Sequence, residues 1–413
     1  MKTSDFDFEL PTDLVASRPL ETRDASRMLV VHSSAMAAGF RVKVGGANLV
    51  CQPTENGGQV CLEDRHIRDI LEYIREGDVI VFNDSRVIPA RFMAGKHEFT
   101  LHTAVADNVW WALCRKFTRL KRGTILDLAD GTQIEVLSTN IKSGAKIKFL
   151  CDDPFAVLER VGKLPLPPYM KREEELADRE RYQTVYASKL GSMAAPTAGL
   201  HFTPELMEEI KARGAKVVKI TLHVGAGTWL PVKEEDLTEH KMHSEWGEIN
   251  EQQARIINKA RRVIAVGTTS LRLLESAANL NRKIPPRRRG KRICPFKRKT
   301  SIFITPGYEF KAVDMLLTNF HLPKSTLFML VSAFSGLDNM KAAYKHAVDE
   351  KYRFFSYGDC CLLYKQKIKK PKPAPAENAD DAVINVAADE ATDTIGIAPA
   401  VPVGCDVPAD VAE

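Results

Sequence analysis

The sequence predicts an α/β main domain, in which helices flank a mixed sheet, and an inserted small antiparallel β-barrel-like domain. Two observations lead to this expectation. Short apolar runs alternate with amphipathic segments along most of the chain, an order typical of α/β folds. Between residues 90 and 150, apolar and polar residues alternate around turn residues about every ten positions, which is typical of antiparallel strands.

The elements of the main domain follow from apolar spacing and turn residues. Residues 67–75 have helical spacing, and the apolar run Asp78–Asn83 predicts a buried strand. Thr203 is expected to cap the next helix, with Pro204 at its first position. Residues 267–270 are expected to form a polar turn after a strand, where α/β folds place ligands. The remaining expected helices are 204–213, 250–261, 271–280, 325–334 and 340–350, and the strands are 217–223 and 263–266.

Domain boundaries follow from these patterns and from composition. We expect a discontinuous main catalytic domain from residues 1–88 and 160–365, with the small β domain at 89–159 between them. Residues 33–62 are Gly-rich and predict an inserted hairpin or loop. Residues 282–299 predict a basic, proline-broken loop, at which a solvated insertion and phosphate contact both stay open. Residues 366–413, rich in Ala, Pro and Asp, predict a disordered tail.

Charge and cysteine usage restrict the class of protein. The net charge is +6 over 413 residues; the tail from residue 366 has four Lys against nine Asp and Glu, so the body carries +6 − (−5) = +11. Such a surplus favours a polyanionic partner such as nucleic acid. No apolar run is long enough to span a membrane, and the N-terminus lacks a signal core, so we expect a cytoplasmic protein without membrane contact. The eight scattered cysteines are expected to be reduced thiols.

Five polar clusters interrupt the apolar elements, and they hold the candidate catalytic residues. They are residues 83–86, 192–203, 221–228, 240–245 and 318–326. Histidines 201, 223, 240, 243 and 321 lie in these clusters. Histidine suits proton transfer near neutral pH, although each of these residues could instead be a hydrogen-bonded turn histidine.

Other kinds of site fit the sequence less well. His240, His243 and Glu245 lack the HExxH register of a zinc site, so no metal site is expected. The segment Gly225–Thr228 matches neither a phosphate-binding loop nor a dinucleotide fingerprint, and no GxSxG nucleophile motif is present. Asp84 and Arg86 could form a structural ion pair instead of a site.

At this point the clusters resemble a known family, the S-adenosylmethionine:tRNA ribosyltransferase-isomerases of queuosine biosynthesis. The matching segments cover most of residues 5–364 in the family's order, and several are long. They include GDVIVFNDSRVIPARF (77–92), SMAAPTAGLHFT (192–203), TLHVGAGTWLPV (221–232), VIAVGTTSLRLLESAA (263–278), PGYEFKAVDMLLTNFHLPKSTLFMLVSAF (306–334) and RFFSYGD (353–359). The chain departs from the family at 33–62, at AGKHEFTLHT (94–103) in place of a TGG-containing hairpin, at the basic loop and at the tail.

The resemblance implies a reaction. The ribosyl group of S-adenosylmethionine would be transferred and isomerised onto the aminomethyl group of a 7-deazaguanine base (preQ1) at the wobble position of tRNA. The product would be epoxyqueuosine-tRNA, with adenine and methionine released. S-adenosylmethionine is then a consumed co-substrate, and proton transfer with positioning needs neither a metal nor a further cofactor. The expected partners are tRNA, through its anticodon loop, and S-adenosylmethionine; a monomer and a homodimer both stay open.

Site roles follow from the positions of polar residues in these turns. His201 and His223 are the first candidates for general acid and base, followed by His321 and Asp84. The expected substrate-binding residues are Thr197, Arg86, Thr268, Thr269, Ser270, Arg272 and Lys324. Aromatic residues near the motifs, Tyr169, Tyr182 and Trp229, could stack on a splayed tRNA base or could pack in the core.

Two other functions remain alternatives. A methyltransferase would need a glycine-rich loop after its first strand, which is not evident. A binding protein for RNA would explain the basic body but not the five polar clusters.

Overall fold

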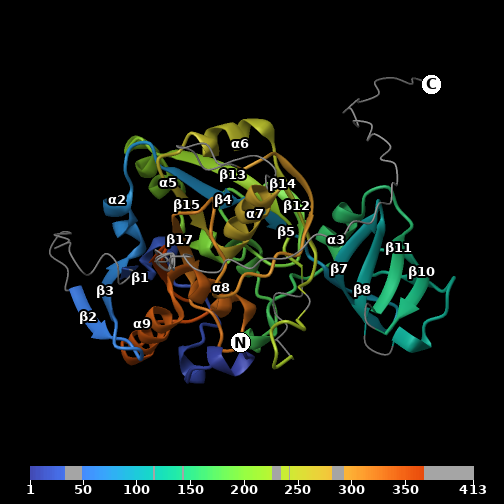
Figure 1. Cartoon of the computed structure of the whole chain (residues 1–413). Coiled ribbons are helices and arrows are strands. Elements are labelled where there is room, and N and C mark those ends of the chain that lie inside the picture. The colour runs from blue at the N-terminus through green and yellow to red at the C-terminus, as the bar shows by residue number, and fades with distance from the viewer. Residues whose placement is uncertain are drawn as a thin grey trace, which may run out of the picture. The chain divides into compact units, whose positions relative to one another are not determined.

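Ten strands form one mixed sheet (Figure 1), in the order β16-β14-β13-β4-β15-β17-β18-β1-β3-β2. The computed structural model describes residues 1–32, 49–114, 117–141, 144–225, 234–240, 242–280 and 293–366. The strands of this sheet are β1 Arg27–His32, β2 Leu49–Pro53, β3 Gln59–His66, β4 Val79–Asn83, β13 Lys216–Leu222, β14 Glu245–Ile249, β15 Val263–Val266, β16 Phe296–Thr300, β17 Met315–Asn319 and β18 Cys360–Tyr364.

Four neighbouring strands at the centre of the sheet run parallel. β4 pairs in parallel with β13 on one side and β15 on the other, and β15 pairs in parallel with β17. Strands β13 to β14 and β17 to β18 pair antiparallel, which makes the sheet mixed. The carboxyl ends of β4, β13, β15 and β17 therefore meet at one edge, where open α/β sheets bind ligands.

Helices cover both faces of this sheet, because successive residues of each strand point to opposite sides. Val79 and Val81 of β4 pack into a core with α6, α7, α8 and α9, whereas Ile80 and Phe82 pack with α2 and α5. The α-helices are α2 Ile70–Tyr73, α3 Pro154–Val161, α4 Asp178–Arg181, α5 Pro204–Ala212, α6 Glu251–Asn258, α7 Thr268–Asn279, α8 Thr326–Ser335 and α9 Leu337–Asp349. Single-turn 3-10 helices are η1 Thr3–Phe6, η2 Thr12–Leu14, η3 Arg23–Ala25, η4 Ile67–Asp69, η5 Phe117–Arg119, η6 Pro168–Met170 and η7 Thr197–His201.

A second sheet of six antiparallel strands has the order β6-β7-β8-β11-β10-β9. Its strands are β6 Arg91–Ala94, β7 His97–Ala106, β8 Val109–Cys114, β9 Ile125–Asp127, β10 Gln133–Asn140 and β11 Gly144–Phe149. An antiparallel bridge between Ala94 and Leu128 joins its two edges, and Gly95 N donates to Asp127 O over 2.8 Å. The sheet thus nearly closes on itself around its own core, to which Val157 and Leu158 of α3 contribute. The expected α/β fold with a barrel-like antiparallel unit is confirmed.

Most expected elements lie within a few residues of those observed, and the N-cap of α5 is confirmed. Thr203 Oγ1 accepts a hydrogen bond from Leu206 N over 3.2 Å, and Pro204 begins the helix. Four expectations differ. Residues 67–75 form η4 and α2 instead of one helix, α7 begins at Thr268 inside the expected turn, β16 lies within the expected basic loop, and β3 is an integral strand of the sheet, not part of an insertion. Residues 33–48, 281–292 and 367–413 lie outside the described part, so the tail remains a prediction.

The cysteines also correct an expectation. Cys51 and Cys61 form a disulfide, whereas all eight cysteines were expected to be reduced. The two residues face each other in the register of β2 and β3, with their Cα atoms 4.1 Å apart. Directly opposed residues of antiparallel strands come this close, so the hairpin itself brings the two thiols together. A hairpin could not be read from residues 33–62 in enough detail to show this pairing.

A helix that spans a membrane has to be long and predominantly apolar. Among the described residues, no helix combines the length and the apolar character that crossing a membrane would require.

Candidate active site

A cavity of about 280 Å³ lies at the carboxyl ends of the parallel strands. The residues that follow β15 and β17 line it, and the segment around η7 and residues 355–356 complete the wall. The described residues of the lining fall into four segments: Ala194–Ala198, Gly267–Thr269, Thr318–Ser325 and Phe355–Ser356, with Tyr169, Tyr182, Val224 and Leu327 besides. The cavity is therefore built where the strand order places a ligand site.

The turn after β15 brings the start of α7 to this cavity. Gly267 adopts a φ of +85°, a conformation that favours glycine, and its N donates to Leu317 O of the neighbouring strand over 2.8 Å. The twelve-residue helix α7 then begins at Thr268 without a side-chain cap. A helix start with free N–H groups favours polar or anionic ligand groups.

Three polar atoms of cavity residues are buried without a hydrogen-bond partner among the described residues. They are Tyr182 OH, Thr269 Oγ1 and Asn319 Oδ1. The amide orientation of Asn319 is fixed, because its Nδ2 donates to Phe355 O over 2.9 Å. Since buried polar groups in folded proteins almost always have partners, Thr269 Oγ1 marks a position where a bound ligand would supply one, whereas the Asn319 side chain lies beside His201.

His321 is the predicted acid–base residue that lines the cavity. Its Nε2 lies 3.1 Å from Thr318 Oγ1, and its backbone N donates to Tyr344 OH over 3.0 Å. Burial lowers the pKa of His321 to about 3. The imidazole is therefore uncharged at neutral pH and is suited to hydrogen bonding inside the cavity.

His201 lies in a separate recess of about 20 Å³ and does not line the main cavity. Its Nδ1 lies 2.9 Å from Ser26 Oγ. Burial lowers its pKa to about 4, a shift that the nearby Asn319 side chain opposes. Asn319 does line the cavity, so His201 is placed to act on the site through Asn319 and not by touching a ligand there.

His223 and Asp84 form a third location. Asp84 Oδ1 accepts from Thr221 Oγ1 over 2.7 Å, and Asp84 Oδ2 accepts from Ser188 Oγ over 3.1 Å. The His223 ring stacks on Trp246 with centroids 5.4 Å apart. Burial lowers the pKa of His223, while the charge of Asp84 opposes the shift. Neither residue lines the cavity, but Val224, the next residue after His223, does.

Some of the predicted binding residues line the cavity and others do not. Thr197, Thr268, Thr269 and Lys324 line the cavity. Lys324 also forms an ion pair with Asp7 over 2.8 Å, and its side chain is about half exposed. These four residues surround the same space as His321.

Three other predicted binding residues lie outside the cavity lining. Arg86 is exposed on β5, Ser85–Val87, which pairs with β12, Lys189–Ser192. Ser270 is fully buried, and its hydroxyl has no partner among the described residues. Arg272 is buried in an ion pair with Glu245, whose Oε1 also accepts from Gly225 N over 3.1 Å. Arg272 is thus already neutralised within the fold.

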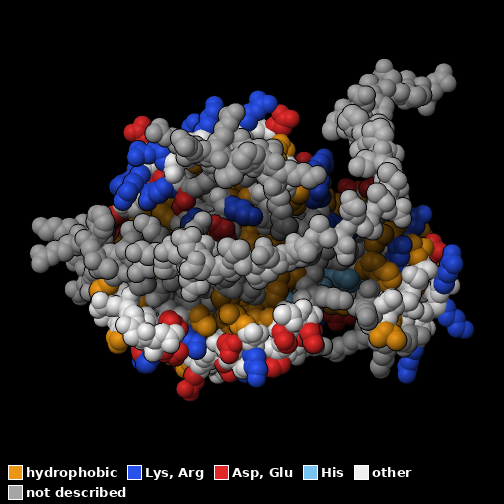
Figure 2. All heavy atoms as spheres, in the orientation of Figure 1, with side chains coloured by type: hydrophobic (Ala, Val, Ile, Leu, Met, Phe, Trp, Pro, Cys, Tyr) orange, Lys and Arg blue, Asp and Glu red, His pale blue; other side chains and the backbone are white. Residues whose placement is uncertain are grey.

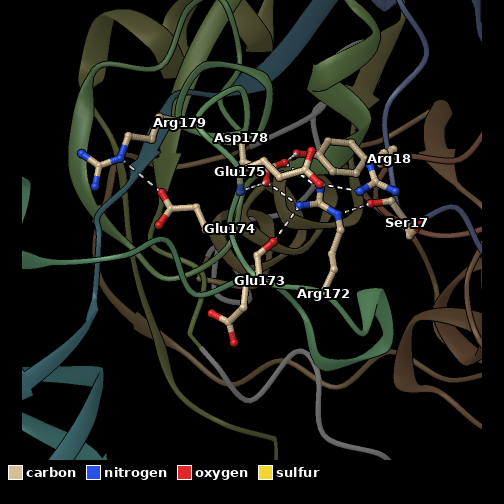
Figure 3. Close-up of polar contacts among 9 residues, drawn as sticks. Ser17, Arg18, Arg172, Glu173, Glu174, Glu175, Asp178 and Arg179 are labelled. Atoms are coloured by element: carbon tan, nitrogen blue, oxygen red, sulfur yellow. Dashed lines mark hydrogen bonds and ion pairs between the residues drawn. The ribbon is translucent and has the colours of Figure 1, made fainter.

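A network of charged residues supports the tyrosine side of the cavity (Figure 3). Arg172 donates to both oxygens of Asp178, over 2.6 and 2.8 Å, and Tyr357 OH donates to Asp178 Oδ1 over 2.8 Å. Burial alone would raise the pKa of Asp178, but the hydrogen bonds, that of Arg172 foremost, hold it below its usual range. The Tyr357 ring packs edge-on against Tyr182, with centroids 5.8 Å apart. The network therefore fixes one wall from outside.

Comparison with known proteins shows which family this chain belongs to. A family model described as queuosine biosynthesis protein matches residues 3–44 and 45–363. The chain belongs to this family. A Parvibaculum lavamentivorans protein named S-adenosylmethionine:tRNA ribosyltransferase-isomerase is 45% identical over 383 residues, which cover 88% of this chain and 99% of that protein. A protein of the same name from a Caulobacter species is 46% identical over 396 residues, covering 88% and 97%.

One solved structure is also similar to this queuosine biosynthesis chain. A crystal structure of S-adenosylmethionine tRNA ribosyltransferase from Thermotoga maritima is 33% identical, covers 87% of this chain and 99% of its own, and gives a TM-score of 0.46.

Several residues that line the cavity were not among the site residues predicted from the sequence. Asn319 lies in the polar cluster that supplied His321 but was not selected, and Phe355 and Ser356 lie in the matching segment RFFSYGD. Tyr169 and Tyr182 were expected either to stack on a tRNA base or to pack in the core, and Trp229 lies outside the described residues. The signal that could have found them is the position of each in a segment shared with the family.

Proposed function

We propose that this chain transfers and isomerises the ribosyl group of S-adenosylmethionine onto preQ1 at the wobble position of tRNA. The product is epoxyqueuosine-tRNA, and adenine and methionine leave. The observation that carries the proposal is the cavity at the carboxyl ends of the parallel strands, in a chain that matches named ribosyltransferase-isomerases over almost its full length. At about 280 Å³, the cavity is slightly below the range of roughly 300–1,000 Å³ that is typical of small-molecule sites.

The cavity suits the smaller of the two substrates. Its lining is mostly apolar, with hydroxyl and amide groups at a few positions and the start of α7 at one side. Such a site binds S-adenosylmethionine by packing and fixes its orientation by a few hydrogen bonds. The tRNA nucleotide then has to reach the cavity from its mouth, with the base splayed out of the anticodon loop.

The chemistry asks this chain for proton transfer and positioning. A base removes a proton from the ribose carbon beside the positively charged sulfur, and the tRNA amine loses a proton when it attacks. We assign the proton transfers to His223 with Asp84, because His223 directly precedes Val224 of the cavity wall and the charge of Asp84 opposes the lowering of the His223 pKa by burial. We assign to His321 a hydrogen bond to the leaving adenine, because its low pKa of about 3 makes it a weak base.

Other parts of the proposal concern partners and location. S-adenosylmethionine is consumed, and the reaction needs no further cofactor. The chain acts in the cytoplasm, where tRNA is modified, as a monomer or homodimer. Exposed Lys and Arg side chains gather over α5 and α6 (Figure 2) and support contact with a polyanion. They include Lys211, Arg213, Lys216, Arg255 and Lys259.

Product analysis tests the proposal. Purified protein is incubated with S-adenosylmethionine, with and without tRNA that carries preQ1, and the small-molecule products are separated by chromatography. We expect adenine and methionine in equal amounts, with tRNA required for turnover. S-adenosylhomocysteine as the product would indicate a methyltransferase instead, and no product with tRNA bound would indicate an RNA-binding protein.

Single substitutions test the assignment of residues. Replacing His223→Ala is expected to lower kcat by a factor of about 10² to 10⁴, the usual contribution of general acid–base catalysis, with KM for S-adenosylmethionine little changed. Replacing Lys345→Ala, at an exposed position of α9 that does not line the cavity, is the comparison. Undiminished turnover of the His223 variant would refute the assignment of proton transfer to this residue.

A further inference from the structure

Phe355 has an unusual backbone conformation at the wall of the cavity. Its φ is +74°, in the region that favours glycine and that is rare for bulky residues. Such strain persists only where the surroundings fix it, and it concentrates at ligand-binding positions. Among the described non-glycine residues with positive φ, Phe355 and Lys324 line the cavity. The conformation of Phe355 is therefore a reason to ask what its ring binds.

Three hydrogen bonds hold the strained backbone in place. Phe355 N donates to Phe320 O over 3.2 Å, and Phe355 O accepts from Asn319 Nδ2 over 2.9 Å and from Gly358 N over 2.9 Å. A Cβ atom on Gly358 would lie 2.4 Å from Arg353 O, so the turn closes only with glycine there. The surroundings thus fix the backbone of Phe355 in the cavity wall.

The ring of Tyr169 lies beside that of Phe355. Their centroids are 4.3 Å apart, at an angle of 37°, and both residues line the cavity. The Tyr169 hydroxyl is hydrogen-bonded to Ser356 Oγ and accepts from Ser356 N over 3.3 Å. Burial raises the pKa of Tyr169 to about 12, so the phenol stays neutral. Two uncharged aromatic rings therefore form one fixed wall.

The charged side chains of the cavity wall decide which groups there could attract a cation. Among the described lining residues there is no Asp or Glu, and the cationic side chain is Lys324, which is paired with Asp7. A ligand with a permanent positive charge finds no carboxylate in this part of the wall. Aromatic faces attract a cation within about 6 Å of the ring centroid, and the attraction grows when water is excluded.

We propose that Phe355 and Tyr169 form the sulfonium-binding wall of the cavity, where their ring faces attract the positively charged sulfur of S-adenosylmethionine. This inference rests on the proposed function, because it needs S-adenosylmethionine as the ligand. The wall distinguishes a sulfonium from an uncharged thioether of similar shape. It also assists turnover: when the bond from sulfur to the ribose carbon breaks, the sulfur keeps the electron pair, and the neutral methionine loses the attraction and leaves.

Binding of two ligands that differ in charge tests the proposal. Isothermal titration measures Kd for S-adenosylmethionine and for S-adenosylhomocysteine, the neutral thioether, on the wild-type protein and on Phe355→Leu. We expect the wild type to prefer the sulfonium. The substitution should weaken S-adenosylmethionine binding on the order of tenfold, the size of a partly desolvated cation–π contact, and S-adenosylhomocysteine binding by less than about threefold.

Matched variants separate charge recognition from packing. Phe355→Tyr keeps an aromatic face and is expected to keep the preference, which also covers the case that Phe355→Leu does not fold. Leu327→Ala removes apolar wall without a ring and should weaken both ligands alike. Lys351→Gly relieves a φ of +55° away from the cavity and should leave both Kd values unchanged.

Two outcomes would overturn the inference and are distinguishable. If Phe355→Leu weakens both ligands equally, the ring packs against the common adenosine or methionine part, and the sulfonium wall is refuted. If the wild type binds neither ligand, the proposed function itself fails. A loss confined to S-adenosylmethionine, with Phe355→Tyr retaining its binding, supports the wall.

Discussion

At the scale of single residues, burial decides what each histidine can do. The pKa of His201 is lowered to about 4 and that of His321 to about 3, in both cases mainly by burial. An imidazole that is neutral at pH 7 donates one hydrogen bond and accepts another. His201 uses its Nδ1 on Ser26, and His321 uses its Nε2 on Thr318. We therefore propose that both residues orient groups in or behind the cavity more than they take protons.

The same burial predicts how stability depends on pH. The unfolded chain takes up protons at these two histidines near pH 6.5, whereas the folded protein does so only near pH 4 and 3. Their contribution to stability is complete above pH 6.5 and falls as the pH drops. When the pH falls from 6.5 to 5, each of the two histidines lowers the free energy of unfolding by about 2 kcal/mol.

Urea unfolding at pH 5, 6 and 7 measures this loss. We expect His201→Gln and His321→Gln each to flatten the pH dependence. His243→Gln, which replaces an exposed histidine, is the control and should leave the dependence unchanged. An unaltered slope in the double variant would show that other groups cause the loss.

At the scale of elements, one buried ion pair joins α7 to β14. Arg272 of α7 meets Glu245 of β14, and both side chains are almost fully buried. Removing one partner of a buried pair leaves the other charge without compensation and typically costs 3–5 kcal/mol. We expect Glu245→Gln to lower the free energy of unfolding by about 3 kcal/mol, and KM for S-adenosylmethionine to stay within about twofold if Arg272 does not contact the ligand.

An exposed ion pair on α6 is the control for the buried pair between α7 and β14. Arg255 and Glu251 of α6 are both exposed, and Arg255→Ala should cost less than about 1 kcal/mol in the same urea titration. A large rise in KM for the Glu245 variant, with stability retained, would instead restore Arg272 as a substrate-binding residue.

Many of the strands and helix caps were predictable from the sequence, for a physical reason. Residues 79–82 are all apolar because β4 is covered by helices on both faces. The caps of α5 and α8 are local, and Thr203 and Ser325 show them in the sequence. Element boundaries at Gly267 were less predictable, because the turn there depends on a hydrogen bond to a strand far along the chain.

The cavity was predictable only in part. Polar residues directly after parallel strands could be expected to meet, and Thr268, His321 and Lys324 do. The aromatic wall could not be read, because Tyr169 and Phe355 come from separate segments that carry no common pattern. The burial of Arg272 against Glu245 was equally hidden, since its partner lies across the sheet and not along the helix.

At the scale of the whole molecule, the charge is unevenly divided along the chain. Residues 1–365 carry +11, and the remaining residues carry −5. Lys and Arg at exposed positions of α5 and α6 belong to the basic part (Figure 2). A surface of this sign releases counterions when it binds a nucleic acid, and this term depends on salt and not on sequence.

The two substrates should therefore respond differently to salt. Raising NaCl from 50 to 200 mM is expected to raise Kd for tRNA roughly fiftyfold if about four phosphates of a single strand are contacted. Kd for S-adenosylmethionine should change less than about twofold, because its cavity holds a single small ligand and no residue of α5 or α6 lines it. Filter binding measures Kd for tRNA, and isothermal titration measures Kd for S-adenosylmethionine.

Changing Lys211, Arg213 and Lys259 together to Ala should reduce the salt slope for tRNA, whereas changing Lys341 and Lys345 of α9 to Ala should not. Equal slopes in the two variants would place the tRNA surface away from α5 and α6, because the number of phosphate contacts sets the slope.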